Sequence, residues 1–190
     1  MWTDTYKLEQ GRIAELIDGM WCYTPKIPKE LELLDGYGDP KAKFRRTVIP
    51  SFMSELKIRW RNKSGNIVYD NPKGDYDFMG IEFTSQQEKW VKDEMGKILH
   101  DGYWCYIGGQ LTWIPMWQYL LLNYWPIDVE TEDGRPEYRD KQRKICLFAY
   151  NIERHPDYYI MAYMKSRRDG ASVLGHIMAL IAIMRKKKAF

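Results

Sequence analysis

The sequence has few residues from which to build a metal site or a disulfide framework. Its 190 residues include only three cysteines, Cys22, Cys105 and Cys146, and three histidines. The cysteines are odd in number, stand far apart and form no C-x-x-C pair, so the pattern excludes a disulfide scaffold and a zinc site. We expect core thiols in a reducing cytosol.

Leader segments and long apolar runs are also lacking. The N-terminus has no basic flank followed by an apolar run, so we expect no secretory signal. The longest apolar run, residues 177–184, is far shorter than the ~20 residues that span a bilayer. These absences predict a protein without membrane contacts that stays in the cytoplasm.

The composition indicates a folded chain with an uneven charge distribution. Hydrophobic residues make up 45% of the chain and aromatic residues 15%, with eight Trp, which is enough to build a core. The net charge is +3, but residues 135–190 carry 13 Lys and Arg against 5 Asp and Glu. Polyanions would therefore prefer the C-terminal third, although part of its excess, residues 185–188, is also what a solvated helix end would carry.

Residues 1–77 predict an N-terminal α+β region of unclear role. An apolar stripe predicts a helix within residues 4–20. Its members are Leu8, Ile13, Leu16 and Ile17. Alternation over residues 56–60, a turn at 63–66 and an apolar stretch at 67–69 predict a β-hairpin.

Residues 78–152 give clearer signals. Ser85 and Glu88 match a capping box, which predicts a helix that ends near Gly102. Gly108 and Gly109 predict a two-residue turn, because both of its positions need positive φ. The elements expected around these signals are strands at 103–107 and 110–114 and helices at 116–124 and 136–152.

Residues 153–190 contain the segment with the strongest chemical signal. An apolar run at 158–164 predicts a strand buried on both faces. A basic loop with Gly170 follows, and then Ser172 and an apolar helix over 173–184. A strand, a glycine-containing loop and a helix N-terminus form the setting of a phosphate-binding loop, in which backbone N–H groups point at an oxyanion. A basic surface turn between a strand and a helix is the alternative.

The loop departs from the standard pattern G-x-x-x-x-G-K-[ST]. Lys165 stands at the first Gly position, and Ala171 replaces the Lys. The positive charge lies upstream instead, on Lys165, Arg167 and Arg168. A long side chain from this position can still reach a β- or γ-phosphate.

This basic-first loop, of the form [SK]-x-R-R-x-G-x-S after an apolar strand, resembles the deviant Walker A motif of large terminase subunits, the DNA-packaging motors of tailed bacteriophages. Four upstream segments are similar to the corresponding region in terminases of crAss-like and related phages. These are residues 102–109, 113–115, 118–127 and 136–140. The resemblance covers about residues 78–184 and is most specific at 165–172.

The resemblance implies an α+β lead-in region followed by the strand, P-loop and helix that begin an α/β P-loop NTPase domain of the RecA-like (ASCE) class, truncated soon afterwards. The expected domains are 1–77, 78–152 as the lead-in, and 153–190 as the start of the ATPase. In its intact form such a protein uses ATP and Mg²⁺ to move double-stranded DNA into a procapsid and cuts the DNA with an RNase H-like nuclease. Its implied partners are the portal, the small terminase subunit and further copies of itself, in the cytoplasm of the bacterial host.

The resemblance also implies roles for individual residues. The nucleotide-binding set is Lys165, Ser166, Arg167, Arg168, Asp169, Gly170, Ala171 and Ser172. Arg167 or Lys165 would bind phosphate, with Arg168 as a second candidate cation. Gly170 would form the loop apex, and Ser172 would hold the nucleotide-bound Mg²⁺. Gln118 and Tyr119 are the candidate adenine contacts.

The sequence lacks the other half of an ATPase site. No later apolar strand ends in Asp-Glu, and no nuclease carboxylate cluster is present. We therefore expect an N-terminal fragment with no catalytic residue, which would not hydrolyse ATP alone. Two alternatives remain at this point, namely another P-loop ATPase such as a helicase and a non-enzymatic nucleic-acid-binding module.

Overall fold

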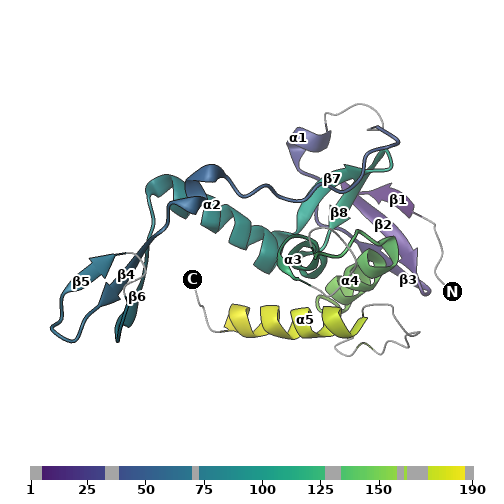
Figure 1. Ribbon diagram of the computed structural model, residues 1–190. Helices are drawn as coiled ribbons and strands as arrows, with labels where there is room; N and C mark the ends of the chain where they lie inside the picture. Colours follow the sequence, from purple (N-terminus) through teal and green to yellow (C-terminus); the bar gives the residue numbers. More distant parts are fainter. Residues whose placement is uncertain are drawn as a thin grey trace. The chain divides into compact units, whose positions relative to one another are not determined.

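The computed structural model describes residues 6–32, 39–69, 73–126, 134–157, 161 and 171–186 (Figure 1). The chain divides into two compact units. Unit 1 comprises Met1–Arg46 and Gly96–Phe190, and unit 2 comprises Thr47–Met95. These units differ from the expected segments 1–77, 78–152 and 153–190, because pairing between distant strands and helices defines a compact unit and local patterns do not reveal it.

Unit 1 begins with an antiparallel meander of three strands. The strands are β1 (Tyr6–Glu9), β2 (Arg12–Ile17) and β3 (Met20–Tyr23). Two-residue turns join them, and all four turn residues have positive φ, between 49° and 83°. Glycine is the second residue of each turn, which suits the left-handed conformation that such hairpins need.

The helix expected within residues 4–20 is wrong. Leu8, Ile13 and Leu16 fit a helical spacing by coincidence, but Gly11 and the Asp18–Gly19 dipeptide divide the segment into strand-length pieces. Asp-Gly between apolar stretches is itself a hairpin signal, and it outweighs a short apolar stripe.

A helix end and a β-hairpin follow one another in the second part of unit 1. A π-helical turn, η2 (Lys97–Asp101), closes at Gly102, whose φ is 65°. A Cβ at Gly102 would overlap the carbonyl oxygen of Ile114, so no other residue fits there without a shift. The expected hairpin is confirmed, with β7 (Tyr103–Ile107) and β8 (Gln110–Ile114) joined at Gly108 and Gly109.

Three helices complete unit 1: α3 (Met116–Tyr124), α4 (Asp140–Ile152) and α5 (Ala171–Lys186). The helix expected at 116–124 is confirmed. The helix expected from residue 136 begins only at Asp140, and the helix expected over 173–184 is longer at both ends. A short helix, α1 (Lys29–Glu32), follows the meander. Almost every side chain of α3 is buried, so this helix forms the centre of unit 1 (Figure 1).

The core of unit 1 joins segments that are far apart in sequence. Ile17 and Cys22 of the meander pack with Trp113 of β8 and Leu147 of α4. The Asn151 side chain of α4 accepts a hydrogen bond from the Tyr23 N–H at 2.8 Å and donates one to the Tyr23 carbonyl at 3.1 Å. Asn151 therefore pairs with the outer edge of β3 as a neighbouring strand would.

Unit 2 is a small antiparallel sheet with one longer helix. A 3₁₀ turn, η1 (Ser51–Ser54), precedes β4 (Lys57–Arg61), β5 (Ile67–Tyr69) and β6 (Asp77–Glu82), in the order β5-β4-β6. The expected hairpin is confirmed, with a turn in which Gly65 has a φ of 85°. One face of β4 presents charged side chains and the other presents Ile58 and Trp60.

Helix α2 (Ser85–Gly96) begins with a capping box that lies one residue before the expected one. The Thr84 N–H donates to Gln87 Oε1 at 2.8 Å, and the Gln87 N–H donates to Thr84 Oγ1 at 3.3 Å. The expected pair of Ser85 and Glu88 is thus corrected to Thr84 and Gln87. Either pair fits the sequence rule, but Gln87 is buried and its amide also donates to the Phe52 carbonyl.

The structure has mixed strands and helices with small antiparallel sheets. The apolar strand expected at 158–164 lies outside the described residues, apart from Met161, which belongs to no helix or strand. In the described part of the chain, no helix is long and apolar enough to cross a membrane.

Candidate functional site

The candidate site predicted from the sequence is at the start of α5. Residues 165–170, with all three candidate cations, lie outside the described residues, as does the side chain of Ala171. Ser172 is described: it is the second residue of α5 and is exposed. The helix was expected from residue 173, but Ser172 lies inside the first turn of α5 and not before it.

The packing of α5 fixes the direction of this helix. Leu174, Ile177 and Ile181 are at most 1% exposed and lie on one stripe, at positions i, i+3 and i+7. This stripe faces α3 and η2. The helix therefore lies along the core of unit 1 with Ser172 at its exposed first turn.

The first turn of α5 suits an anion. A helix N-terminus carries free backbone N–H groups and a partial positive charge, and α5 has no acidic residue in its first turn. An exposed hydroxyl at the second helical position would lie beside an oxyanion bound there. These features are those that favour an anion at a helix N-terminus.

The two candidate adenine contacts are buried in the core. Gln118 and Tyr119 are both 0% exposed. Gln118 Nε2 donates to the Arg139 carbonyl at 3.1 Å, and the Tyr119 ring lies 5.5 Å from that of Tyr103. These contacts hold α3 against its neighbours, so the structure argues against the adenine role and we do not retain it.

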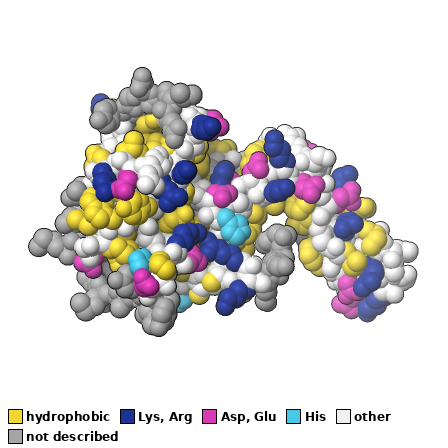
Figure 2. Space-filling model, turned by 180° about the vertical axis from the view of Figure 1, so that it is seen from behind, with side chains coloured by type: hydrophobic (Ala, Val, Ile, Leu, Met, Phe, Trp, Pro, Cys, Tyr) yellow, Lys and Arg dark blue, Asp and Glu magenta, His cyan; other side chains and the backbone are white. Residues whose placement is uncertain are grey.

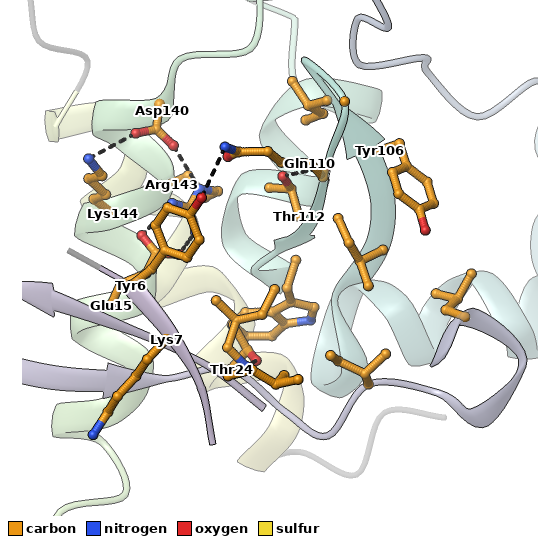
Figure 3. Close-up of a pocket in the computed structure, with 18 of the residues that line it drawn as sticks. Tyr6, Lys7, Glu15, Thr24, Tyr106, Gln110, Thr112, Asp140, Arg143 and Lys144 are labelled. Carbon is orange, nitrogen blue, oxygen red and sulfur yellow. Dashed lines mark hydrogen bonds and ion pairs between the residues drawn. The ribbon is translucent and has the colours of Figure 1, made fainter. Parts of the chain in front are cut away.

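A pocket lies elsewhere in unit 1, between the meander, the β7–β8 hairpin and the start of α4. Its volume is about 1010 Å³ (Figure 3). Apolar side chains such as Leu8, Ile13 and Leu111 line much of it. Among its lining residues, Gln110 Nε2 lies 3.4 Å from the Tyr6 hydroxyl, so side chains of β8 and β1 contact each other there (Figure 3).

A buried charge cluster forms one end of this pocket. The Arg143 guanidinium donates to both carboxylate oxygens of Glu15, at 2.7 and 2.6 Å, and its Nε donates to Asp140 Oδ1 at 2.8 Å (Figure 3). Lys144 Nζ lies 3.2 Å from Asp140 Oδ2. The Arg143 side chain is only 7% exposed, so its two carboxylate partners are what make its burial tolerable.

The cluster shifts the pKa values of its members in opposite directions. Burial alone would lower the pKa of Arg143, but the hydrogen bonds and charge of Glu15 raise it above its usual range. Burial would raise the pKa of Asp140, but the Arg143 charge lowers it. The Arg143–Glu15 pair ties β2 to α4, and Asp140 holds the guanidinium from within α4, so we assign the cluster a structural role.

Local sequence patterns do not reveal this cluster as a whole. Asp140, Arg143 and Lys144 stand at i, i+3 and i+4 on one helix, a spacing that indicates ion pairs. Glu15, however, is 128 residues away from Arg143. No local pattern connects them.

Two arginines of the described surface, Arg61 and Arg46, already have protein partners. Arg61 pairs with Asp77 at 3.1 Å, and Arg46 donates to the carbonyls of Arg135 and Pro136. On the face seen in Figure 2, Lys and Arg side chains are interspersed with Asp and Glu side chains. The described surface on this side thus gives little support to a binding module that relies on positive charge alone.

The cysteines and the other possible metal ligands form no further site among the described residues. Cys22 and Cys146 are buried, and burial raises the pKa of Cys22 and of the half-buried Cys105 to about 12. Within the described ranges, no group of three or more His, Cys, Asp or Glu side chains could hold a metal ion. Because their pKa values are raised, the thiols of Cys22 and Cys105 are poor nucleophiles at neutral pH.

Comparison with known proteins adds no relative. No protein-family model, no curated protein and no solved structure matches this chain.

Proposed function

We propose that this chain carries the N-terminal part of a phage large terminase subunit, with the phosphate-binding loop and first helix of its ATPase domain. In the intact protein this domain would use ATP to move double-stranded DNA into a procapsid. The observation that carries the proposal is the exposed Ser172 at the start of α5, directly after the basic, glycine-containing segment 165–170.

The two faces of α5 support this proposal. Its inner stripe is buried against α3 and η2, yet its outer face is also apolar, with Leu180 38% exposed and Ile183 53% exposed. A helix that is apolar all round belongs between two layers. In a P-loop ATPase the helix after the loop has this environment, because a β-sheet covers its second face.

The roles follow from the chemistry of the side chains. Lys165, Arg167 and Arg168 would neutralise the phosphates, and Gly170 would let the backbone approach them. The Ser172 hydroxyl would hold the magnesium ion, which supplies charge neutralisation at the β- and γ-phosphates when bound. The residue that activates water is not among those we assign.

Nucleotide binding tests the proposal directly. Isothermal titration calorimetry with Mg·ATPγS should give saturable binding to the wild-type chain. Arg167→Ala and Ser172→Ala should each weaken it about tenfold or more, since each removes a contact to phosphate or magnesium. Matched controls in unit 2, Arg59→Ala and Ser64→Ala, replace exposed side chains of the same types and should bind as the wild type does.

The outcomes separate the alternatives. Binding that is equal in all four variants would refute the assignment of the loop. Binding to DNA with a steep salt dependence but without any effect of Mg·ATPγS would favour the non-enzymatic module. In the intact protein, full ATPase activity of the Lys165→Ala, Arg167→Ala and Ser172→Ala variants would refute the motor proposal as well.

A further inference from the structure

The C-terminal end of α5 makes a contact that the phosphate-binding role does not explain. Arg185 Nε donates a hydrogen bond to the Leu99 carbonyl at 2.6 Å, and Arg185 Nη1 donates to Glu153 Oε1 at 2.9 Å. The Arg185 side chain is 18% exposed. One guanidinium thus joins α5 to η2 and to the residue after α4.

The Leu99 carbonyl needs such a partner. It lies in the π-helical turn η2, which closes with a hydrogen bond from the Gly102 N–H to the Lys97 carbonyl at 3.0 Å. Tyr103 and Trp104, whose amides would serve Leu99 if the helix continued, are instead in the extended backbone of β7. Because Leu99 is 8% exposed, water cannot readily replace the missing donor.

This π turn has a special place in the chain. Helix α2 of unit 2 ends at Gly96, and η2 follows at once, so the chain passes from unit 2 into unit 1 through these residues. A π turn is a local departure from α-helical geometry that persists only where its surroundings stabilise it, and such turns are frequent at functional sites. Arg185 supplies one of the contacts that stabilise it.

We propose that Arg185 is a positioning residue that holds the π turn and couples it to the state of α5. The coupling rests on the proposed function: the 13 helical steps from Ser172 to Arg185 span about 20 Å of one rigid helix, and a nucleotide bound at Ser172 would order that helix. The guanidinium at its far end then stabilises η2, where the chain leaves for unit 2. One end of α5 would thus carry the nucleotide site, and the other end contacts η2 through Arg185.

Hydrogen exchange followed by mass spectrometry tests the positioning role without nucleotide. In Arg185→Met, which keeps the apolar stem and loses the donors, amides of residues 97–102 should exchange at least tenfold faster. Arg185→Lys keeps the charge near Glu153 but cannot donate to both partners, so its rate should lie in between. Arg154→Met is the matched control, because exposed Arg154 also pairs with Glu153, at 3.0 Å, and should leave these amides unchanged.

The amides of β7 and β8 show whether an effect is local. They should exchange at the wild-type rate in every variant. If Arg185→Met accelerates exchange in β7 and β8 too, its effect is not local. The positioning role is then judged by comparing the exchange of residues 97–102 in Arg185→Lys with that in Arg154→Met. Equal exchange of residues 97–102 in those two variants would overturn the positioning role.

The same experiment with Mg·ATPγS tests the coupling. The nucleotide should slow exchange at 97–102 in the wild type by about threefold or more, and the effect should be lost in Arg185→Lys. If calorimetry shows that the nucleotide binds but exchange at 97–102 does not change, the coupling is wrong although the proposed function stands. If no nucleotide binds, the proposed function and the coupling both fail, while the nucleotide-free comparison still decides the positioning role.

Discussion

Unit 1 and unit 2 bury different kinds of side chain. The buried hydrophobic residues that the structure describes all belong to unit 1, among them Trp113, Tyr119 and Ile181. In the described part of unit 2 the buried side chains are Gln87 and Glu94, whereas Phe78 is 59% exposed. Unit 1 is therefore stabilised by its own core, and unit 2 depends on hydrogen bonds and half-buried contacts.

The difference shows that a regular sheet and a capped helix do not guarantee a stable unit. Thr47–Met95 is shorter than the roughly 60-residue domains that are already marginal, because a small unit buries a small share of its surface. Its exposed apolar side chains add nothing to its stability while they face water. We expect unit 2 to open locally at a much lower free energy than unit 1.

Removing a large core side chain from unit 1 should produce the largest effect. Trp113 is 0% exposed and its indole N–H donates to the Asp101 carbonyl, so Trp113→Ala should lower the free energy of unfolding by about 3–5 kcal/mol. Urea unfolding followed by circular dichroism measures this. The counterpart in unit 2, Phe78→Ala, should cost less than about 1 kcal/mol. Equal costs would show that unit 2 has a hydrophobic core of its own.

Breaking the buried ion pair should have the next largest effect. Glu15→Gln leaves the Arg143 guanidinium buried with Asp140 as its remaining carboxylate, and we expect a loss of about 2–3 kcal/mol. In unit 2, Asp77→Asn breaks an exposed pair with Arg61 and should cost under about 1 kcal/mol. The same urea experiment compares them. A Glu15→Gln variant as stable as the wild type would contradict the structural role of the cluster.

Substitutions at the start of α2 should have the smallest effect on stability. They test whether Thr84 or Ser85 is the capping residue. Thr84→Ala removes the side-chain acceptor of the Gln87 N–H and should destabilise α2 by about 1 kcal/mol. Ser85→Ala should change stability by only a few tenths of a kcal/mol. Hydrogen exchange of the first turn of α2 distinguishes the two. A larger effect at Ser85 would restore the capping box expected from the sequence.

Features set by neighbouring residues could be predicted from the sequence, and features set by distant ones could not. Gly108 and Gly109 specify their turn by themselves, and the hairpin around them has the expected strands. The Ser85 capping box was wrong by one residue, because only the burial of Gln87 distinguishes two equally good local patterns.

The N-terminal meander shows the limit of periodicity. Four apolar residues fitted a helix, yet two turn signals that were present in the same segment defined strands instead. Gln118 and Tyr119 show a different limit, because their burial could not be predicted. The type of a side chain gives its chemistry, but its burial depends on residues such as Arg139 and Tyr103 that come from other elements.

The Asn151 amide has a consequence for self-association. An unpaired strand edge is a template on which another chain can add a strand, and natural sheets protect their edges against this. Because Asn151 occupies both main-chain groups of Tyr23, the β3 side of the meander is already closed at that residue by a side chain from a helix. A misfolded or neighbouring strand cannot extend the sheet there without first displacing α4.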